Sequence, residues 1–251
     1  MFVIVVVLLL AGGNAASVHR QVKQMTENHI DSVRKPPTKS FITLSRRPPA
    51  VIPHEPGAAL ELTCEAVAAP APSIHWFKND APVYEYDKGS NEIIEANPTS
   101  LARISSTLLV ARTDAPAKYS CLAVSGQHTA HANTIVYSTD GSVDNSERAK
   151  LVPLAPKIVV SYKVYVDTIG SNIVLPCEVK GHPRPAVTWR DNNGTIVKKS
   201  ARMQVLRSGA LRLRNVAWSD LGAWRCGASN AFGGAGAETF LYPARPNDTD
   251  G

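Results

Sequence analysis

The chain has 251 residues, which exceeds the roughly 100 residues of one small β-sandwich and suffices for two. Lys and Arg outnumber Asp and Glu by 27 to 21, giving a formal net charge of +6, and 44% of the residues are hydrophobic. A single long apolar run at the N-terminus excludes a protein that crosses a membrane repeatedly. The positive charge favours acidic partners such as sulfated glycans, and no motif for nucleic acid is present.

The N-terminal segment MFVIVVVLLLAGGNAA, residues 1–16, predicts a secretory signal peptide. Its apolar part, about 11 residues, is too short for a membrane-spanning helix, which needs roughly 20. Small side chains follow it, as a cleavage site requires. We therefore expect a secreted, extracellular chain that is not inserted in a membrane.

The four cysteines fall into two equivalent halves. An even number of cysteines in an exported chain predicts disulfides, and the absence of a CxxC pair argues against zinc. In each half a tryptophan follows the first cysteine by twelve positions, after two prolines. This repeat predicts two similar domains. Its members are Cys64, Trp76 and Cys121 in the first half, and Cys177, Trp189 and Cys226 in the second.

Alternating apolar and polar residues around these positions predict antiparallel strands, as in residues 60–66, 173–179 and 211–214. No long segment shows the 3.6-residue period of a helix. Two sheets stacked about 10 Å apart can be joined across their inner faces by a disulfide, with a tryptophan packed beside it. The sequence therefore predicts an all-β fold of two sandwiches, each with its own bridge.

The run before the last cysteine, WSDLGAWRC, resembles the D-x-G-x-Y-x-C pattern of intermediate-type (C2-like) immunoglobulin domains. In that family the tyrosine hydroxyl bonds back to the preceding corner. Trp224 stands at the tyrosine position, so this resemblance leaves open whether the bond forms. In the first half, TDAPAKYSC places Asp114 one residue early, which predicts a bulge or a longer corner.

A closer resemblance is densest over residues 170–243, in segments such as GSNIVLPCEV and NAFGGAGAETFLYP. There the sequence resembles the insect imaginal-morphogenesis-protein-late family, also called neural/ectodermal development factors. These are secreted proteins with two immunoglobulin domains. The resemblance implies that the chain binds an insulin-like peptide outside the cell and limits its signalling.

Composition divides the chain further. The stretch STDGSVDNSERAK is rich in Ser, Asp, Asn and Gly and indicates an interdomain linker. The expected organisation is a signal peptide (1–16), a flexible leader (17–35), a first immunoglobulin-like domain (36–138), a linker (139–152), a second domain (153–243) and a tail (244–251).

Apolar side chains that the core does not need are candidate ligand contacts. In KIVVSYKVYVD the even positions from Ile158 to Val166 form the expected core face, which leaves Val159 and Tyr165 pointing outward. Such a strand can offer an apolar strip and a free edge to a peptide. The alternative is a strand that switches sheets midway and buries both faces.

Three further groups are ambiguous. Trp218 is either an exposed anchor or folded over a sheet edge. Tyr84 and Tyr86 either pair across strands or meet a ligand. A basic cluster forms either a stripe for sulfated glycan or an ordinary solvated face. Its members are Lys198, Lys199, Arg202, Arg207, Arg212 and Arg214.

Two sequons make Asn193 and Asn247 candidate glycosylation sites. His128 and His131 lie in a predicted hairpin, where alternation sends them to opposite faces, so we expect no metal site. No nucleophile motif supports catalysis, and we expect neither enzyme activity nor a cofactor. The expected function is sequestration of an insulin-like peptide. The alternatives are a cell-adhesion or guidance protein and a heparan-binding matrix protein.

Overall fold

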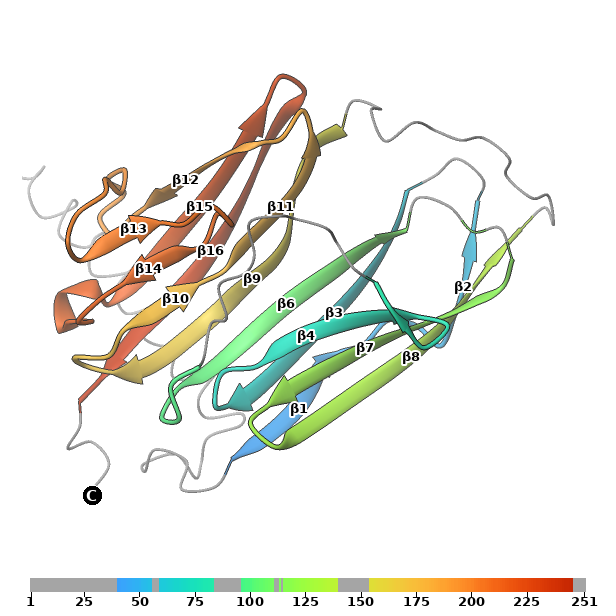
Figure 1. Cartoon of the computed structure of the whole chain (residues 1–251), viewed down its shortest axis with the longest axis horizontal. Coiled ribbons are helices and arrows are strands. Elements are labelled where there is room, and N and C mark those ends of the chain that lie inside the picture. Colours follow the sequence, from blue (N-terminus) through green and yellow to red (C-terminus); the bar gives the residue numbers. More distant parts are fainter. Residues whose placement is uncertain are drawn as a thin grey trace, which may run out of the picture. The chain divides into compact units, whose positions relative to one another are not determined.

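The computed structural model describes residues 40–55, 59–83, 96–110, 113, 115–139 and 154–245. Residues 39–244 form one compact unit. Its described residues build two β-sandwiches, which confirms the predicted fold class (Figure 1). The expected signal peptide and leader, nearly all of the linker, Tyr84, Tyr86 and Asn247 lie outside the described residues.

The first sandwich consists of two sheets. Along a strand of such a sandwich, side chains that point into the core alternate with side chains that point away from it. Strand β6 (Leu101–Val110) shows this clearly, because buried and half-buried residues alternate strictly along it. The smaller sheet comprises β1 (Phe41–Arg46), β3 (Leu60–Ala69) and β6 (Leu101–Val110). The larger comprises β2 (Val51–His54), β8 (His128–Ser138), β7 (Ala117–Ser125), β4 (Ser73–Lys78) and β5 (Ala81–Pro82).

The second sandwich repeats this plan with a longer first strand. One layer comprises β9 (Leu154–Thr168), β16 (Gly233–Ala244), β15 (Gly222–Asn230) and β12 (Ala186–Arg190). The other comprises β10 (Ile173–Leu175), β14 (Leu211–Leu213) and β13 (Met203–Val205). Strand β11 (Cys177–His182) pairs with β9, and a single 3₁₀ turn, η1 (Trp218–Asp220), precedes β15.

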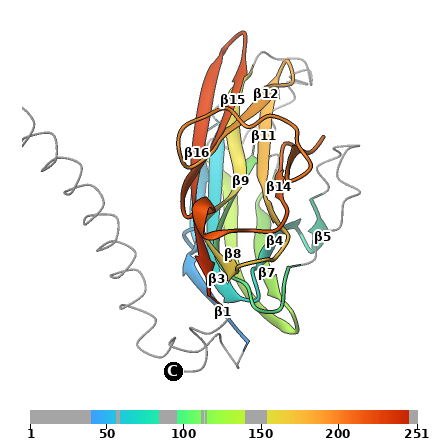
Figure 2. The same cartoon turned by 90° about the vertical axis from the view of Figure 1, so that its left-hand side faces the viewer.

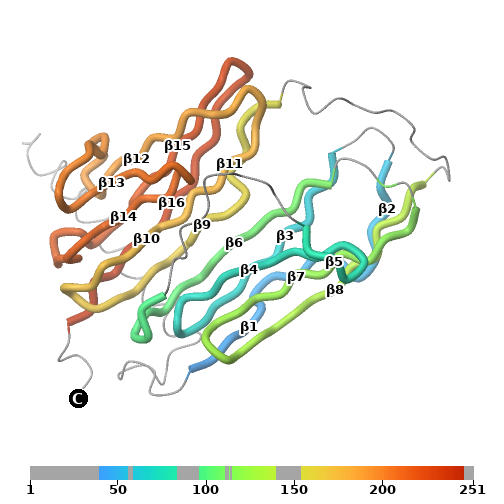
Figure 3. The backbone as a smooth tube through the Cα atoms, viewed as in Figure 1, coloured from blue at the N-terminus to red at the C-terminus, as the bar shows by residue number. Residues whose placement is uncertain are grey.

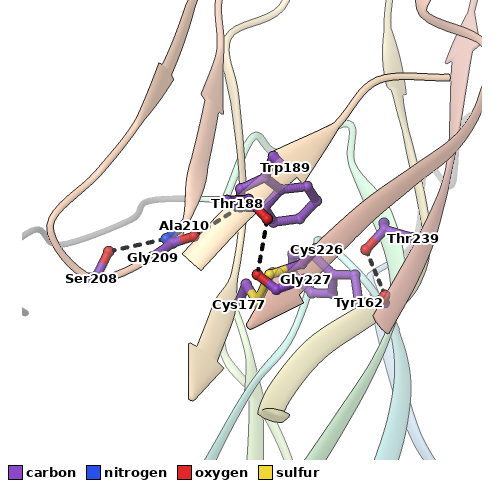
Figure 4. The surroundings of a disulfide bond; sticks show 10 residues. All are labelled: Tyr162, Cys177, Thr188, Trp189, Ser208, Gly209, Ala210, Cys226, Gly227 and Thr239. Atoms are coloured by element: carbon purple, nitrogen blue, oxygen red, sulfur yellow. Dashed lines mark hydrogen bonds between the residues drawn. A yellow bond between two sulfur atoms is a disulfide. The ribbon is translucent and has the colours of Figure 1, made fainter. Parts of the chain in front are cut away.

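Both disulfides form as predicted, Cys64–Cys121 and Cys177–Cys226. Figure 4 shows Trp189 beside the second bridge, where its indole Nε1 donates to the Gly209 carbonyl over 2.8 Å. Gly209 has a φ of +91°, and a Cβ there would lie 2.7 Å from the Cys177 carbonyl oxygen. A side chain at this position is therefore both strained and obstructed.

The indole of Trp224 holds the chain turn that precedes β15. Trp224 is buried, and its Nε1 donates to the Asp220 carbonyl over 2.9 Å. The tryptophan therefore makes the bond back to the corner that the family's tyrosine hydroxyl makes, which settles the question left open by the sequence.

The carboxylate of Asp220 also holds this corner in place. It accepts two hydrogen bonds from the Arg202 guanidinium, at 2.6 and 2.7 Å, and one from the Ala217 N–H at 2.8 Å. Burial alone would raise the pKa of Asp220, but these hydrogen bonds and the guanidinium charge hold it below its usual value. Arg202 therefore belongs to the framework of the fold.

Strand β9 joins the two sandwiches. It pairs antiparallel with β6 of the first sandwich, from Leu101 opposite Val166 to Ser106 opposite Val160. One sheet therefore runs through both sandwiches in the order β1-β3-β6-β9-β16-β15-β12, as Figure 3 shows along the backbone. The strand edge expected to be free for a peptide is occupied by the first domain.

The expectation that Val159 and Tyr165 point outward is wrong, since each is only 3% exposed. The first half of β9 pairs with β11, the second half pairs with β16, and the pairing with β6 skips Lys163. The skip at Lys163 shifts the alternation by one residue and so places Tyr165 in the core. The pairing with β11 has a separate irregularity that skips Val159, between Ile158 and Val160. The alternative interpretation, a strand that switches sheets and buries residues of both faces, is confirmed.

Side chains reinforce this junction. The buried Asp167 carboxylate accepts from Asn97 Nδ2 at 2.7 Å and from Thr99 Oγ1 at 3.2 Å. The Tyr162 hydroxyl donates to the Pro72 carbonyl over 3.3 Å. Burial raises the pKa of Tyr162 and of Tyr165, and the Asp167 charge raises that of Tyr165 further. Both phenols therefore stay neutral at the junction.

Candidate binding face

The continuous sheet has a side that faces away from both cores, which we call the open face. Partners directly opposite in a sheet project to the same side. One row of such partners runs through Val67, Arg103, Val164, Phe240 and Ala223 on successive strands. A second row runs through Leu101, Val166 and Tyr242. All eight side chains are half-buried.

The open face combines strands from both sandwiches because β6 and β9 are hydrogen-bonded neighbours. Strands of both sandwiches run in nearly the same direction in Figure 2, as this pairing requires. The residues between the open-face positions, such as Ala102, Tyr165 and Leu241, are buried on the other side. The apolar residues of the open face are therefore surplus to the cores.

Trp218 extends this surface. The η1 turn sets its ring edge-on against Tyr242, with centroids 5.9 Å apart and planes at 82°. The side chain remains 44% exposed. The structure combines the two expectations for Trp218, since its ring packs against Tyr242 of β16 while the side chain stays partly exposed.

Two ion pairs lie on the same side of the sheet, one in each sandwich. Arg103 lies 2.6 Å from Glu65 in the first, and Arg225 lies 2.9 Å from Glu238 in the second. Each pair satisfies its own charges across neighbouring strands. An apolar and aromatic centre with charged groups beside it is the composition typical of a protein-binding surface.

Other chemistry has little support in the described part of the chain. There, no group of three or more His, Cys, Asp or Glu side chains could hold a metal ion. His128 bonds to Ser40, whereas His131 pairs opposite Leu122. Among the described residues, no helix is long and apolar enough to span a membrane.

Asn193 is exposed in the turn after β12. The Asp191 carboxylate accepts from the backbone N–H groups of Asn193 and Thr195, at 3.0 and 2.8 Å, and so shapes this turn. Glycosylation of Asn193 stays a prediction, as does that of Asn247.

Sequence reasoning missed most of the open face. The segment TFLYP carries apolar side chains on both faces of a strand, with Leu241 in the core and Phe240 and Tyr242 outside it. The criterion applied to residues 158–166 would have found these two aromatics. No local pattern marks Leu101, which joins the surface only because β6 pairs with β9.

Known proteins resemble the chain along most of its length. A family model described as Immunoglobulin domain matches residues 41–125 and 155–230. The chain is 30% identical over 248 residues to the neural/ectodermal development factor IMP-L2 of Drosophila melanogaster, covering 94% of this chain and 93% of that protein. It is 28% identical over 185 residues to Contactin-5 of Gallus gallus, covering 71% of this chain but 15% of that protein.

A solved structure gives the same result. The crystal structure of neural ectodermal development factor IMP-L2 matches with a TM-score of 0.73 at 28% identity, covering 83% of this chain and 98% of that one. Sequence and fold thus agree over both sandwiches, and the chain belongs to the IMP-L2 family of proteins with immunoglobulin domains.

Proposed function

We propose that the chain is a secreted binding protein, without enzyme activity, that captures an insulin-like peptide on the open face. Capture lowers the concentration of peptide free to reach its receptor. Membership of the IMP-L2 family supports the choice of ligand through the resemblance described above. The observation that carries the choice of surface is the row Leu101, Val166 and Tyr242, whose apolar side chains continue across both sandwiches.

The physical basis is burial of apolar hormone surface. A standard interface covers about 800 Å² per partner. A few side chains cannot cover this area, so the interface needs a broad surface. Aromatic residues often dominate binding energy, and Phe240, Tyr242 and Trp218 lie together on the second sandwich. Because hydrogen-bonded strands hold the face in place, binding needs little ordering of the protein.

Secretion agrees with the two disulfides, since such bridges persist in oxidising compartments. A glycan on the exposed Asn193 is part of this proposal. Analysis of secreted protein by mass spectrometry before and after enzymatic removal of N-glycans tests it directly.

Calorimetric titration of the full chain with a recombinant insulin-like peptide tests the proposed function. Phe240→Glu places a charge in the middle of the open face, and we expect it to weaken binding at least tenfold, or about 1.4 kcal/mol. Tyr137→Glu is the matched control, because Tyr137 is likewise an aromatic residue outside the cores but lies on β8 of the first sandwich. Absence of heat at micromolar concentrations of the unmodified chain would refute the proposal.

A second candidate is recognition between immunoglobulin proteins. Contactin-5 contains a segment similar to this chain. A separate apolar patch also lies on β2 and β8, where Val51 pairs opposite Ile135 and Pro53 opposite Tyr137. Self-association in sedimentation experiments that Ile135→Glu abolishes would favour this function over hormone capture.

A further inference from the structure

Charge is distributed unequally between the two sandwiches. Residues 154–245 contain 13 Lys and Arg against 5 Asp and Glu, a net charge of +8. Residues 40–139 contain 7 against 9, a net charge of −2. No acidic residue occurs between Asp191 and Asp220, where six basic residues lie. The second sandwich is therefore a strongly positive body on a chain of modest overall charge.

The structure arranges these cations along the β13–β14 hairpin. Arg207 is exposed in the turn between the strands. Arg212 faces outward on β14, because its neighbours Leu211 and Leu213 are fully buried. Arg214 is exposed just beyond the end of β14, and its Nη1 approaches the Ala201 carbonyl.

Two further cations complete this arrangement. Lys198 and Lys199 are exposed in the segment that leads into β13, and the Arg214 N–H donates to the Arg202 carbonyl of the same segment. The Arg184 guanidinium donates to the Arg207 carbonyl over 3.2 Å, which brings another positive charge to the turn. We call five of these cations the basic stripe, namely Lys198, Lys199, Arg207, Arg212 and Arg214, and Arg184 borders the stripe at the turn.

The acidic groups closest in sequence to the stripe have partners of their own. Asp220 is paired with Arg202, which is why Arg202 is left out of the stripe. Asp191 accepts from the N–H groups of its own turn. The stripe follows the length of a hairpin. The stretch from Leu211 to Arg214 alone is roughly 10 Å long at the rise of a strand. A linear set of cations complements a linear polyanion better than a single small anion.

We propose that the basic stripe binds a chain of sulfated glycosaminoglycan. The stripe lies on the β10-β14-β13 layer, whereas the open face lies on the layer of β16, β15 and β12 (Figure 1). The polysaccharide and a protein ligand therefore occupy different sheets of the second sandwich. This inference does not depend on the proposed hormone function, although together they describe a binding protein retained in the extracellular matrix.

Heparin affinity chromatography of the full chain tests the proposal. We expect retention at about 0.15 M salt, where long-range attraction is already screened beyond about 8 Å. Arg207→Gln with Arg214→Gln should lower the slope of log affinity against log salt by about two, one for each arginine replaced. The control is Arg46→Gln with Arg47→Gln, which removes the same charge from exposed positions of the first sandwich and should leave the slope unchanged.

Passage of the unmodified chain through the column at about 0.15 M salt would overturn the proposal, and so would equal shifts in both variants. Unsulfated hyaluronan should compete poorly, and equal competition by it would overturn the requirement for sulfate. Thermal unfolding confirms that the variants fold. Calorimetry with the insulin-like peptide is run in parallel. The stripe variants should still bind the peptide, so the glycosaminoglycan proposal and the hormone proposal can fail separately.

Discussion

The two sandwiches share the Cys-Trp-Cys frame but fix their tryptophans by different means. In the first, Trp76 is 9% exposed and its Nε1 donates to the side-chain hydroxyl of Ser106 over 3.0 Å. In the second, Trp189 is 1% exposed and its Nε1 donates to the backbone carbonyl of Gly209. A repeated apolar frame therefore does not repeat its polar contacts, because any acceptor at the right distance satisfies a buried indole.

The edges of the two sandwiches differ in a complementary way. The smaller sheet of the first ends at β6, and the second presents the long strand β9. An unpaired strand edge tends to recruit another strand. Pairing β6 with β9 satisfies both edges and produces a surface that neither sandwich has alone.

The largest effect should come from the feature that the sandwiches share. Replacing both Cys177 and Cys226 with Ala removes a bridge between residues 49 positions apart, which should cost about 4 kcal/mol of unfolding free energy in the chain-entropy model. The same change at Cys64 and Cys121, 57 positions apart, should cost a similar amount. Chemical denaturation measures both, and an unchanged stability in either variant would contradict the common frame.

The next effect should be confined to the second sandwich. Asp220→Ala leaves the Arg202 guanidinium and the Ala217 N–H without their acceptor, which should cost about 2–3 kcal/mol. Since the folded pKa of Asp220 is lowered, its contribution is complete above the unfolded pKa of about 4 and is lost as pH falls through the folded value. Denaturation between pH 7 and pH 2, at roughly constant salt, should show a shallower acid decline for Asp220→Asn.

A smaller effect should appear where the sandwiches meet. Asp167→Ala removes the acceptor for Asn97 and Thr99, which should cost about 2 kcal/mol. The unmodified chain should unfold in one calorimetric transition because the shared sheet couples its halves. In the variant we expect that transition to broaden or split, and a sharp transition at unchanged temperature would show that this contact does not couple the sandwiches.

The smallest effect separates the two ways of fixing a tryptophan. Ser106→Ala leaves the Trp76 N–H without its hydroxyl partner and should cost about 1 kcal/mol, or roughly 2–4 °C in Tm. Ser105→Ala, one residue away and not in the core, is the control and should change stability by less than about 0.5 kcal/mol. Trp189 cannot be tested in this way, because its acceptor is a backbone carbonyl.

Features that depend on local spacing could be predicted from the sequence. The strands follow from alternation over a few residues, and the cysteine pairs follow from the repeated Cys-Trp-Cys spacing of the two halves. The bond from Trp224 to its corner was left open by the sequence. The outward assignment failed because the pairing of β9 with β11 skips Val159 and its pairing with β6 skips Lys163, before Tyr165, and alternation alone gives no sign of such irregularities.

The open face lies beyond the reach of local patterns for a different reason. Leu101 and Phe240 share a surface only because β6 pairs with β9 and β9 pairs with β16. Only β6 looks like an ordinary sandwich strand by its alternation, and the apolar residues on both faces of β9 and β16 do not show which strands they pair with. Pairing between strands far apart in sequence depends on edges and register, which a single sequence does not display.

The central claim is that one binding surface uses both sandwiches, and two substitutions in a single calorimetric series test it most directly. Leu101→Glu alters the open face on the first sandwich, and Phe240→Glu alters it on the second. If the account is correct, each variant binds an insulin-like peptide at least tenfold more weakly, by about 1.4 kcal/mol, while unfolding as the unmodified chain does. Unchanged affinity in a folded Leu101→Glu variant would contradict a face shared by the two sandwiches.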